Sequence, residues 1–185
     1  HAWSALKLGD RTAALLGRVT LNPRAHLDLM GSLLFLVAFV GWGRPTPVKP
    51  ENLKGDPDTG MALVSLAGPL SNIAFAIILG LPIRIGLIDW RPPFQTVPFQ
   101  GTGTIDSIAD IVAYAILFNI FLAVFNLLPL PPLDGFKVAL WALPSTLRNL
   151  LKPLERYGPI PLIALVSVEY ISPFGVLSGV LIPLA

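Results

Sequence analysis

The chain has 185 residues, of which 54% are hydrophobic and 13% are charged, and its mean hydropathy is +0.70. Because soluble domains carry about 25% charged residues, this composition excludes an ordinary soluble domain and predicts an all-α, polytopic membrane protein. The net charge of +2 gives no basis for nucleic-acid binding, and the absence of Cys means that any metal must be bound by His and carboxylate side chains.

In the first half of the chain, the sequence pattern predicts the end of one helix and one short apolar segment. Residues 1–10 are typical of the last turns of a helix, with Gly9 as its C-terminal stop. Residues 11–28 are polar and basic, which favours an interfacial segment. Residues 29–43 are apolar, but these 15 residues are fewer than the roughly 20 that a membrane span needs. The proline-rich residues 44–50 predict extended chain.

The second half predicts two membrane spans. Residues 59–83 are uncharged and long enough to cross a bilayer, and residues 111–133 form the second clear span. Between them, residues 84–103 read as a loop, and residues 136–156 carry charges typical of an interface. Residues 158–184 are apolar but interrupted, which leaves one or two membrane segments open. We expect residues 1–185 to form a single membrane-embedded helical bundle that lacks its N-terminal part.

A carboxylate at the end of the second span is the first candidate functional residue. Three prolines follow Asn126 and break the helix, and Asp134 then precedes Gly135. Burying an unpaired carboxylate at membrane depth costs several kcal/mol, so an ionisable residue there indicates a functional site. The alternative is an ordinary Asp-Gly turn at the membrane surface.

Several short motifs, in this order and spacing, resemble the site-2 protease family of intramembrane zinc metallopeptidases, in its compact prokaryotic branch. The resemblance covers nearly the whole chain. The matching pieces are His1-Ala2-Trp3, Leu8-Gly9-Asp10, Gly17 to Pro23, His26-Leu27-Asp28, Gly43 to Val48, Ala67 to Asn72, and Phe125 to Gly135.

The resemblance implies a Zn²⁺ site and the residues that bind it. In the family, a His-Glu-x-x-His helix supplies two ligands on one face, its Glu is the general base, and an aspartate is the third ligand. By position, His1 is similar to the second histidine and Asp134 to that aspartate. The first histidine and the glutamate would lie four and three residues before His1. We therefore expect this chain alone to be inactive and the parent protein to be an enzyme.

The two predicted ligands imply a membrane topology, because residues that bind one ion must lie at one membrane depth. If residues 29–43 spanned the bilayer, His1 and Asp134 would end at opposite faces, so we expect a re-entrant or interfacial segment at 29–50. With that segment re-entrant, one side carries 11 Lys and Arg residues and the other carries 2, whereas a spanning segment gives 6 against 7. The positive-inside rule then places the metal site near the cytoplasmic face of the cell membrane.

Two asparagines are candidates for positioning a substrate. The amide of Asn126 would bind a substrate backbone or a developing oxyanion, with a helix–helix hydrogen bond as the alternative. Asn72 is a weaker candidate, for which packing is the preferred interpretation. We expect His26 and Asp28 to bond each other or to order the re-entrant segment rather than to form a second metal site.

The predicted partners are the lipid bilayer and a transmembrane protein substrate, and the sequence leaves the oligomeric state open. The predicted function is zinc-dependent proteolysis of membrane helices. Two alternatives remain: a catalytically inactive homologue that binds membrane helices, and a small transporter subunit, which would need polar residues along its spans.

Overall fold

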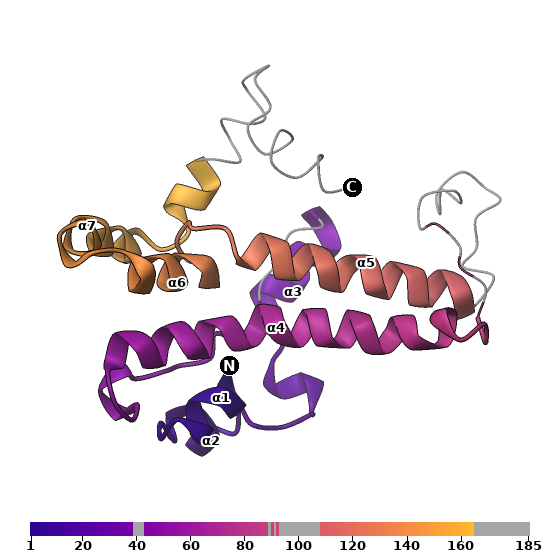
Figure 1. Ribbon diagram of the computed structural model, residues 1–185, viewed down its shortest axis with the longest axis horizontal. Helices are drawn as coiled ribbons and strands as arrows, with labels where there is room; N and C mark the ends of the chain where they lie inside the picture. The colour runs from indigo at the N-terminus through magenta and orange to yellow at the C-terminus, as the bar shows by residue number, and fades with distance from the viewer. Residues whose placement is uncertain (39–42, 89, 91, 93–107, 165–185) are drawn as a thin grey trace. The chain divides into compact units, whose positions relative to one another are not determined.

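A computed structural model describes residues 1–38, 43–88, 90, 92 and 108–164 (Figure 1). The chain divides into two compact units, residues 1–68 and residues 69–185. Helices dominate the described residues, and an isolated antiparallel bridge between Leu27 and Gly43 is the β-pairing found there. The predicted all-α class is therefore confirmed for the described part of the chain.

The first unit begins with the short helix that the sequence predicts. Helix α1 spans Ala2–Lys7, and Gly9 follows it with a φ of 111°, a backbone conformation that favours glycine. Helix α2 (Thr12–Leu15) comes next and contacts α1. The 3₁₀ turn η1 spans Pro23–Ala25 and is capped by Asn22, whose side chain accepts a hydrogen bond from the Arg24 amide.

The apolar segment predicted to be re-entrant contains helix α3 (Leu29–Ala38). These ten residues are too few to cross a bilayer, which needs roughly 20. The residues on either side of the segment meet, because Leu27 pairs with Gly43 and the Arg44 amide donates to the His26 carbonyl at 2.8 Å. The two ends of the apolar segment therefore lie next to each other.

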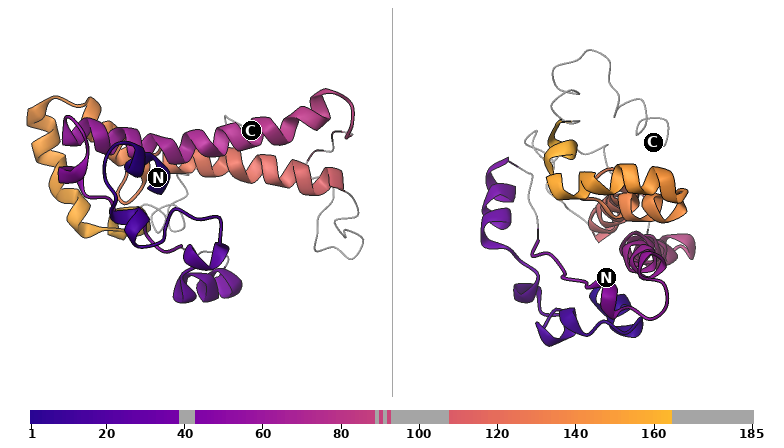
Figure 2. Two further views of the ribbon diagram at one scale, coloured as in Figure 1. Left: turned by 90° about the horizontal axis from the view of Figure 1, so that it is seen from below. Right: turned by 90° about the vertical axis from the view of Figure 1, so that its left-hand side faces the viewer.

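The longest helix, α4 (Pro57–Arg84), begins in the first unit and continues into the second, and Figure 2 shows it as one continuous ribbon. It follows the 3₁₀ turn η2 (Pro50–Asn52). Its bounds lie within two residues of the predicted span at each end. Pro69 lies inside α4, where it cannot donate a hydrogen bond to the preceding turn.

Helix α5 (Ile108–Asn126) is the second apolar helix, and it ends seven residues before the predicted end of the span. Residues 127–133, here called the proline turn, are not helical. Pro129 and the two prolines after it have no backbone N–H with which to continue the helical hydrogen bonds. Within the described residues, α4 and α5 are the helices long and apolar enough to cross a membrane.

Short helices follow the proline turn. Helix α6 spans Asp134–Ala142, α7 spans Ser145–Leu151, and the 3₁₀ segment η3 spans Lys152–Tyr157. The Arg148 guanidinium in α7 donates to the carbonyls of Leu140, Trp141 and Leu143, which satisfies groups at the end of α6. The predictions for residues 165–184 and for most of the 84–103 loop lie outside the described residues.

Candidate metal site

His1 is held at the start of α1 by a bond to another helix. It is the N-cap residue of α1, and its Nδ1 lies 2.8 Å from the backbone carbonyl oxygen of Val64 in α4. Because a carbonyl oxygen only accepts hydrogen bonds, this contact requires the proton on Nδ1. Histidines that bind metals through one ring nitrogen commonly donate from the other to a carbonyl in this way, which fixes the tautomer and the ring.

The contact is supported by a small apolar cluster in the same unit. Ala5, Leu53 and Val64 are all buried and pack together, so α1, the loop before α4 and α4 itself share one core. The Lys54 amide also donates to the Leu8 carbonyl at 2.8 Å. The backbone that carries His1 is therefore held against α4 and against the loop before it.

A buried carboxylate adds hydrogen bonds between the end of α1 and the loop before α4. Asp10 is fully buried just after α1. Its Oδ1 accepts bonds from the Thr12 amide at 2.9 Å, the Thr12 hydroxyl at 2.5 Å and the Asn52 side-chain amide at 3.2 Å, while its Oδ2 accepts from the Lys49 amide at 2.8 Å. Burial by itself would raise the pKa of Asp10, but these hydrogen bonds favour the charged form and lower the pKa to about 2.

From the sequence alone, Asp10 has no predicted role. The spacing Asp10-Arg11-Thr12 fits a local side-chain turn, and that is the signal the sequence offers. The bonds from Lys49 and Asn52 come from 39 and 42 residues further along the chain, so they are visible only in the fold.

Asp134 is the first residue of α6 and belongs to the second unit. The residue after it is packed against the end of α5: a Cβ built on Gly135 would lie 2.0 Å from the Leu127 carbonyl oxygen and 2.6 Å from that of Leu128. No side chain fits there. Only glycine allows the proline turn to fold back onto the start of α6, and this close contact fixes the backbone that carries Asp134.

The predicted positioning residues lie on the two long helices. The Asn126 side-chain nitrogen donates to the Leu122 carbonyl at 2.8 Å, within its own helix. Asn72 lies in α4 with its side chain partly exposed.

His26 and Asp28 have separate partners around the apolar segment. His26 Nε2 lies 2.8 Å from the Thr20 carbonyl oxygen, and Asp28 accepts a bond from the Gly31 amide at 3.0 Å, at the start of α3. The Asp28 bond lies at the start of α3 and the His26 bond lies before it, so the predicted role of the two residues in ordering the segment stays a prediction.

Two of the predicted metal ligands, His1 and Asp134, lie among the residues that the structure describes. No three His, Asp or Glu side chains come together among the residues that the structure describes. His1 and Asp134 belong to different units, so their pairing on one ion stays a prediction. The engaged Nδ1 of His1 is the feature that suits a metal ligand.

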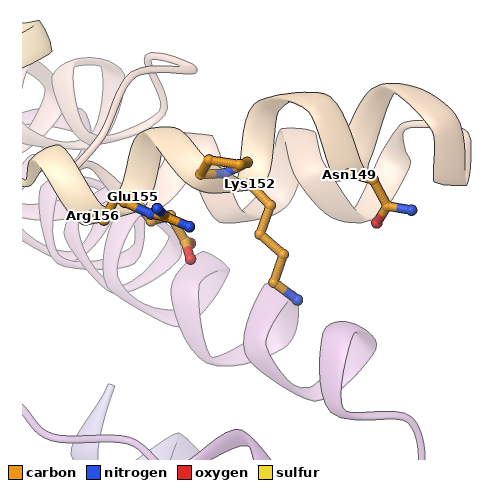
Figure 3. Close-up of a pocket in the computed structure, with 5 residues that line it drawn as sticks. Asn149, Lys152, Glu155 and Arg156 are labelled. Carbon is orange, nitrogen blue, oxygen red and sulfur yellow. The ribbon is translucent and has the colours of Figure 1, made fainter.

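A hollow of about 420 Å³ lies elsewhere, along α7 and η3. It is lined by Asn149, Lys152, Pro153, Glu155 and Arg156, and Figure 3 shows the labelled side chains on successive turns. It contains two cationic side chains and neither predicted ligand. We therefore do not identify it with the metal site.

Comparison with known proteins places the chain in a family. The model of peptidase family M50 matches residues 91–158, which include Asn126 and Asp134. YwhC of Bacillus subtilis, named as a predicted zinc metalloprotease, is 39% identical over 175 residues, which cover 95% of this chain and 74% of that protein. Rip2 of Mycobacterium tuberculosis, named in the same way, is 30% identical over 168 residues, covering 89% of this chain and 60% of that protein.

No solved structure matches the chain. The similarity to YwhC extends over almost the whole chain and about three quarters of that protein, and the family model covers the proline turn and the predicted aspartate ligand. The chain belongs to peptidase family M50.

Proposed function

We propose that the chain is the core of a site-2-type zinc metalloprotease that hydrolyses peptide bonds of transmembrane proteins inside or near the bilayer. The observation that carries this proposal is the bond from His1 Nδ1 to the Val64 carbonyl, which presents the imidazole in the tautomer that binds metal through Nε2. The names of the relatives, both predicted zinc metalloproteases, support Zn²⁺ as the metal.

His1 and Asp134 are the proposed ligands within this chain. A histidine four residues before His1 would complete the protein ligands, and a glutamate three residues before it would move the proton. When bound, zinc supplies a Lewis acid that activates water and polarises the scissile carbonyl. A transmembrane substrate must unwind locally first, because a helix engages its own carbonyls.

The two asparagines are proposed to position the substrate. Asn126 lies at the last residue of α5, eight residues before Asp134, and its side chain carries both a donor and an acceptor. Its bond to Leu122 uses one of the two amide protons, which leaves the carbonyl oxygen to accept from a substrate amide. Asn72 is the weaker candidate, because its position in α4 also suits packing.

The proposed setting is the cell membrane, with several spans and the metal site near the cytoplasmic face. Helices α4 and α5 are the proposed spans within the described residues. The bridge between Leu27 and Gly43 supports a re-entrant 29–50 segment, because a segment whose ends pair cannot have crossed the bilayer. The substrate then reaches the site from the membrane.

The test uses the full-length protein, purified in detergent. His1→Ala and Asp134→Ala should each lower bound zinc from about one equivalent to near zero and abolish cleavage of a reconstituted transmembrane substrate. Asp58→Asn serves as a control for removing a carboxylate outside the proposed site. Zinc retained by both variants would refute the ligand assignment. Zinc bound normally without cleavage of any membrane substrate would indicate an inactive homologue.

A further inference from the structure

Asp10 joins the end of α1 to the loop before α4. Four donors converge on its two carboxylate oxygens: two from Thr12, the side-chain amide of Asn52 and the backbone amide of Lys49. A fully buried carboxylate with this many donors is costly to leave unsatisfied, so the loop residues that supply them are held in place.

The loop held by Asp10 is the one that supports His1. Leu53, one residue after Asn52, packs with Ala5 of α1 and Val64 of α4. The carbonyl of Val64 is the group that holds the His1 ring. Gly9 adds to this fit, because a Cβ there would lie 3.1 Å from the Asn52 carbonyl oxygen, so the loop passes close to the end of α1.

Two details separate Asp10 from an ordinary turn residue. The bonds from Thr12 are local and would form in any Asx-type turn, whereas those from Lys49 and Asn52 connect distant segments. Asp10 is also separated from His1 by the whole of α1, so its effect on a metal bound at His1 would pass through the backbone between them.

We propose that Asp10 is a positioning residue for the metal site: its carboxylate fixes α1 against the loop before α4, so that His1 keeps its Nδ1 bond to the Val64 carbonyl and would bind the metal through Nε2. This inference rests on the proposed function, because it assumes that His1 is a ligand. It assigns Asp10 a role in metal affinity, and not only in folding.

Asp10→Asn is the most informative variant, because it keeps the shape of the side chain and replaces one acceptor oxygen by a donor nitrogen. Whichever way the amide lies, its nitrogen faces either Lys49 or the Thr12 and Asn52 donors, so at least one bond is lost. Thr12→Val removes the hydroxyl bond to Asp10 and the 3.4 Å bond that the same hydroxyl accepts from Asn52, and it keeps the backbone bond from Thr12. Glu51→Gln changes an exposed carboxylate beside Asn52 and serves as the charge control.

The first measurement is zinc affinity of the full-length protein by chelator competition, at a temperature where tryptophan fluorescence shows each variant folded. Asp10→Asn should weaken binding on the order of tenfold, the lower end of what outer partners of metal ligands contribute. Thr12→Val should weaken it by less than about threefold, and Glu51→Gln should leave it unchanged.

The second measurement is the tautomer of His1 in the zinc-free protein, by ¹⁵N NMR with histidine labelling. The parent should show His1 protonated on Nδ1, and Asp10→Asn should show a mixture of tautomers, a change that a purely structural role would not produce. If Asp10→Asn does not fold, Asn52→Ala removes the distant bond to Asp10, together with the 3.4 Å bond to the Thr12 hydroxyl, and should weaken zinc binding about threefold relative to Glu51→Gln.

The outcomes also separate this inference from the proposed function. If His1→Ala abolishes zinc binding while folded Asp10→Asn, or Asn52→Ala in its place, binds zinc like the parent, the positioning role is refuted and the ligand assignment stands. If His1→Ala keeps its zinc, the ligand assignment itself is refuted.

Discussion

At the scale of single residues, Gly135 shows how a missing side chain sets the place of a predicted ligand. The carbonyls of Leu127 and Leu128 lie so close that any Cβ at position 135 would overlap them. These are backbone atoms of a proline-rich turn, which cannot give way as the end of a flexible side chain would. The backbone position of Asp134, the residue before Gly135, depends on the same contact.

We therefore expect Gly135→Ala to destabilise the protein by about 1–3 kcal/mol, as overpacking in a tight site does, and to lower its zinc content. Thermal unfolding in detergent and metal analysis would measure both. Gly80→Ala is the matched control, because nothing lies within 4 Å of a Cβ there. A Gly135→Ala protein with the stability and zinc content of the Gly80→Ala protein would contradict the prediction.

His1 and Asp134 stay predicted ligands, and the contacts around them could not be predicted from the sequence, for a physical reason. His1 and Asp134 stand in short motifs that can be read locally. The partners of His1 and Asp10 are backbone groups, the Val64 carbonyl and the Lys49 amide, and every residue except proline has such groups. Only the fold determines which carbonyl or amide reaches a given side chain.

At the scale of elements, the two long helices differ in how well their ends were predicted. The bounds of α4 follow from charge, because Asp58 and Arg84 flank an uncharged run. For α5 the run of apolar residues continued past the helix end at Asn126, and the prolines that stop it come after that point. Hydrophobic composition alone therefore predicts too long a helix. Its end is set by proline, which disfavours the helical conformation in the residue before it.

The pairing of Leu27 with Gly43 yields a prediction about the apolar segment between them. The chain contains no Cys, so Leu27→Cys combined with Gly43→Cys gives two defined thiols. A Cβ at position 43 would lie 3.0 Å from the His26 carbonyl oxygen, and a short bifunctional maleimide tolerates the small shift that this requires. Because paired residues have Cα atoms about 5 Å apart, we expect an intrachain cross-link, identified by peptide mass spectrometry.

Leu27→Cys combined with Ile85→Cys is the control, because the proposed topology separates these positions by a membrane crossing. Each single variant should react with a monofunctional maleimide. Thiols at 27 and 43 that react singly but never cross-link would show that the segment does not return to its starting point.

At the scale of the whole molecule, charge and helix length combine into one testable topology. Helix α4 has 28 residues, about 42 Å at 1.5 Å per residue, which exceeds the roughly 30 Å hydrocarbon core. The chain before α4 carries seven Lys and Arg residues up to Lys54, whereas the other end of α4 and the loop before α5 carry two, Arg84 as the last residue of the helix and Arg91. The positive-inside rule orients such a helix with its first residue at the cytoplasmic face.

Single cysteines on either side of α4 test this orientation. Lys54→Cys and Ile85→Cys both replace exposed side chains, in a chain without other cysteines. In intact cells expressing the full-length protein, a membrane-impermeant maleimide should label Ile85→Cys and leave Lys54→Cys unmodified until the membrane is opened. Because His1 is tied to Val64 in the first third of α4, the same result would place the proposed metal site toward the cytoplasmic face. Labelling of Lys54→Cys from outside the cell would reverse α4 and with it the predicted side of the site.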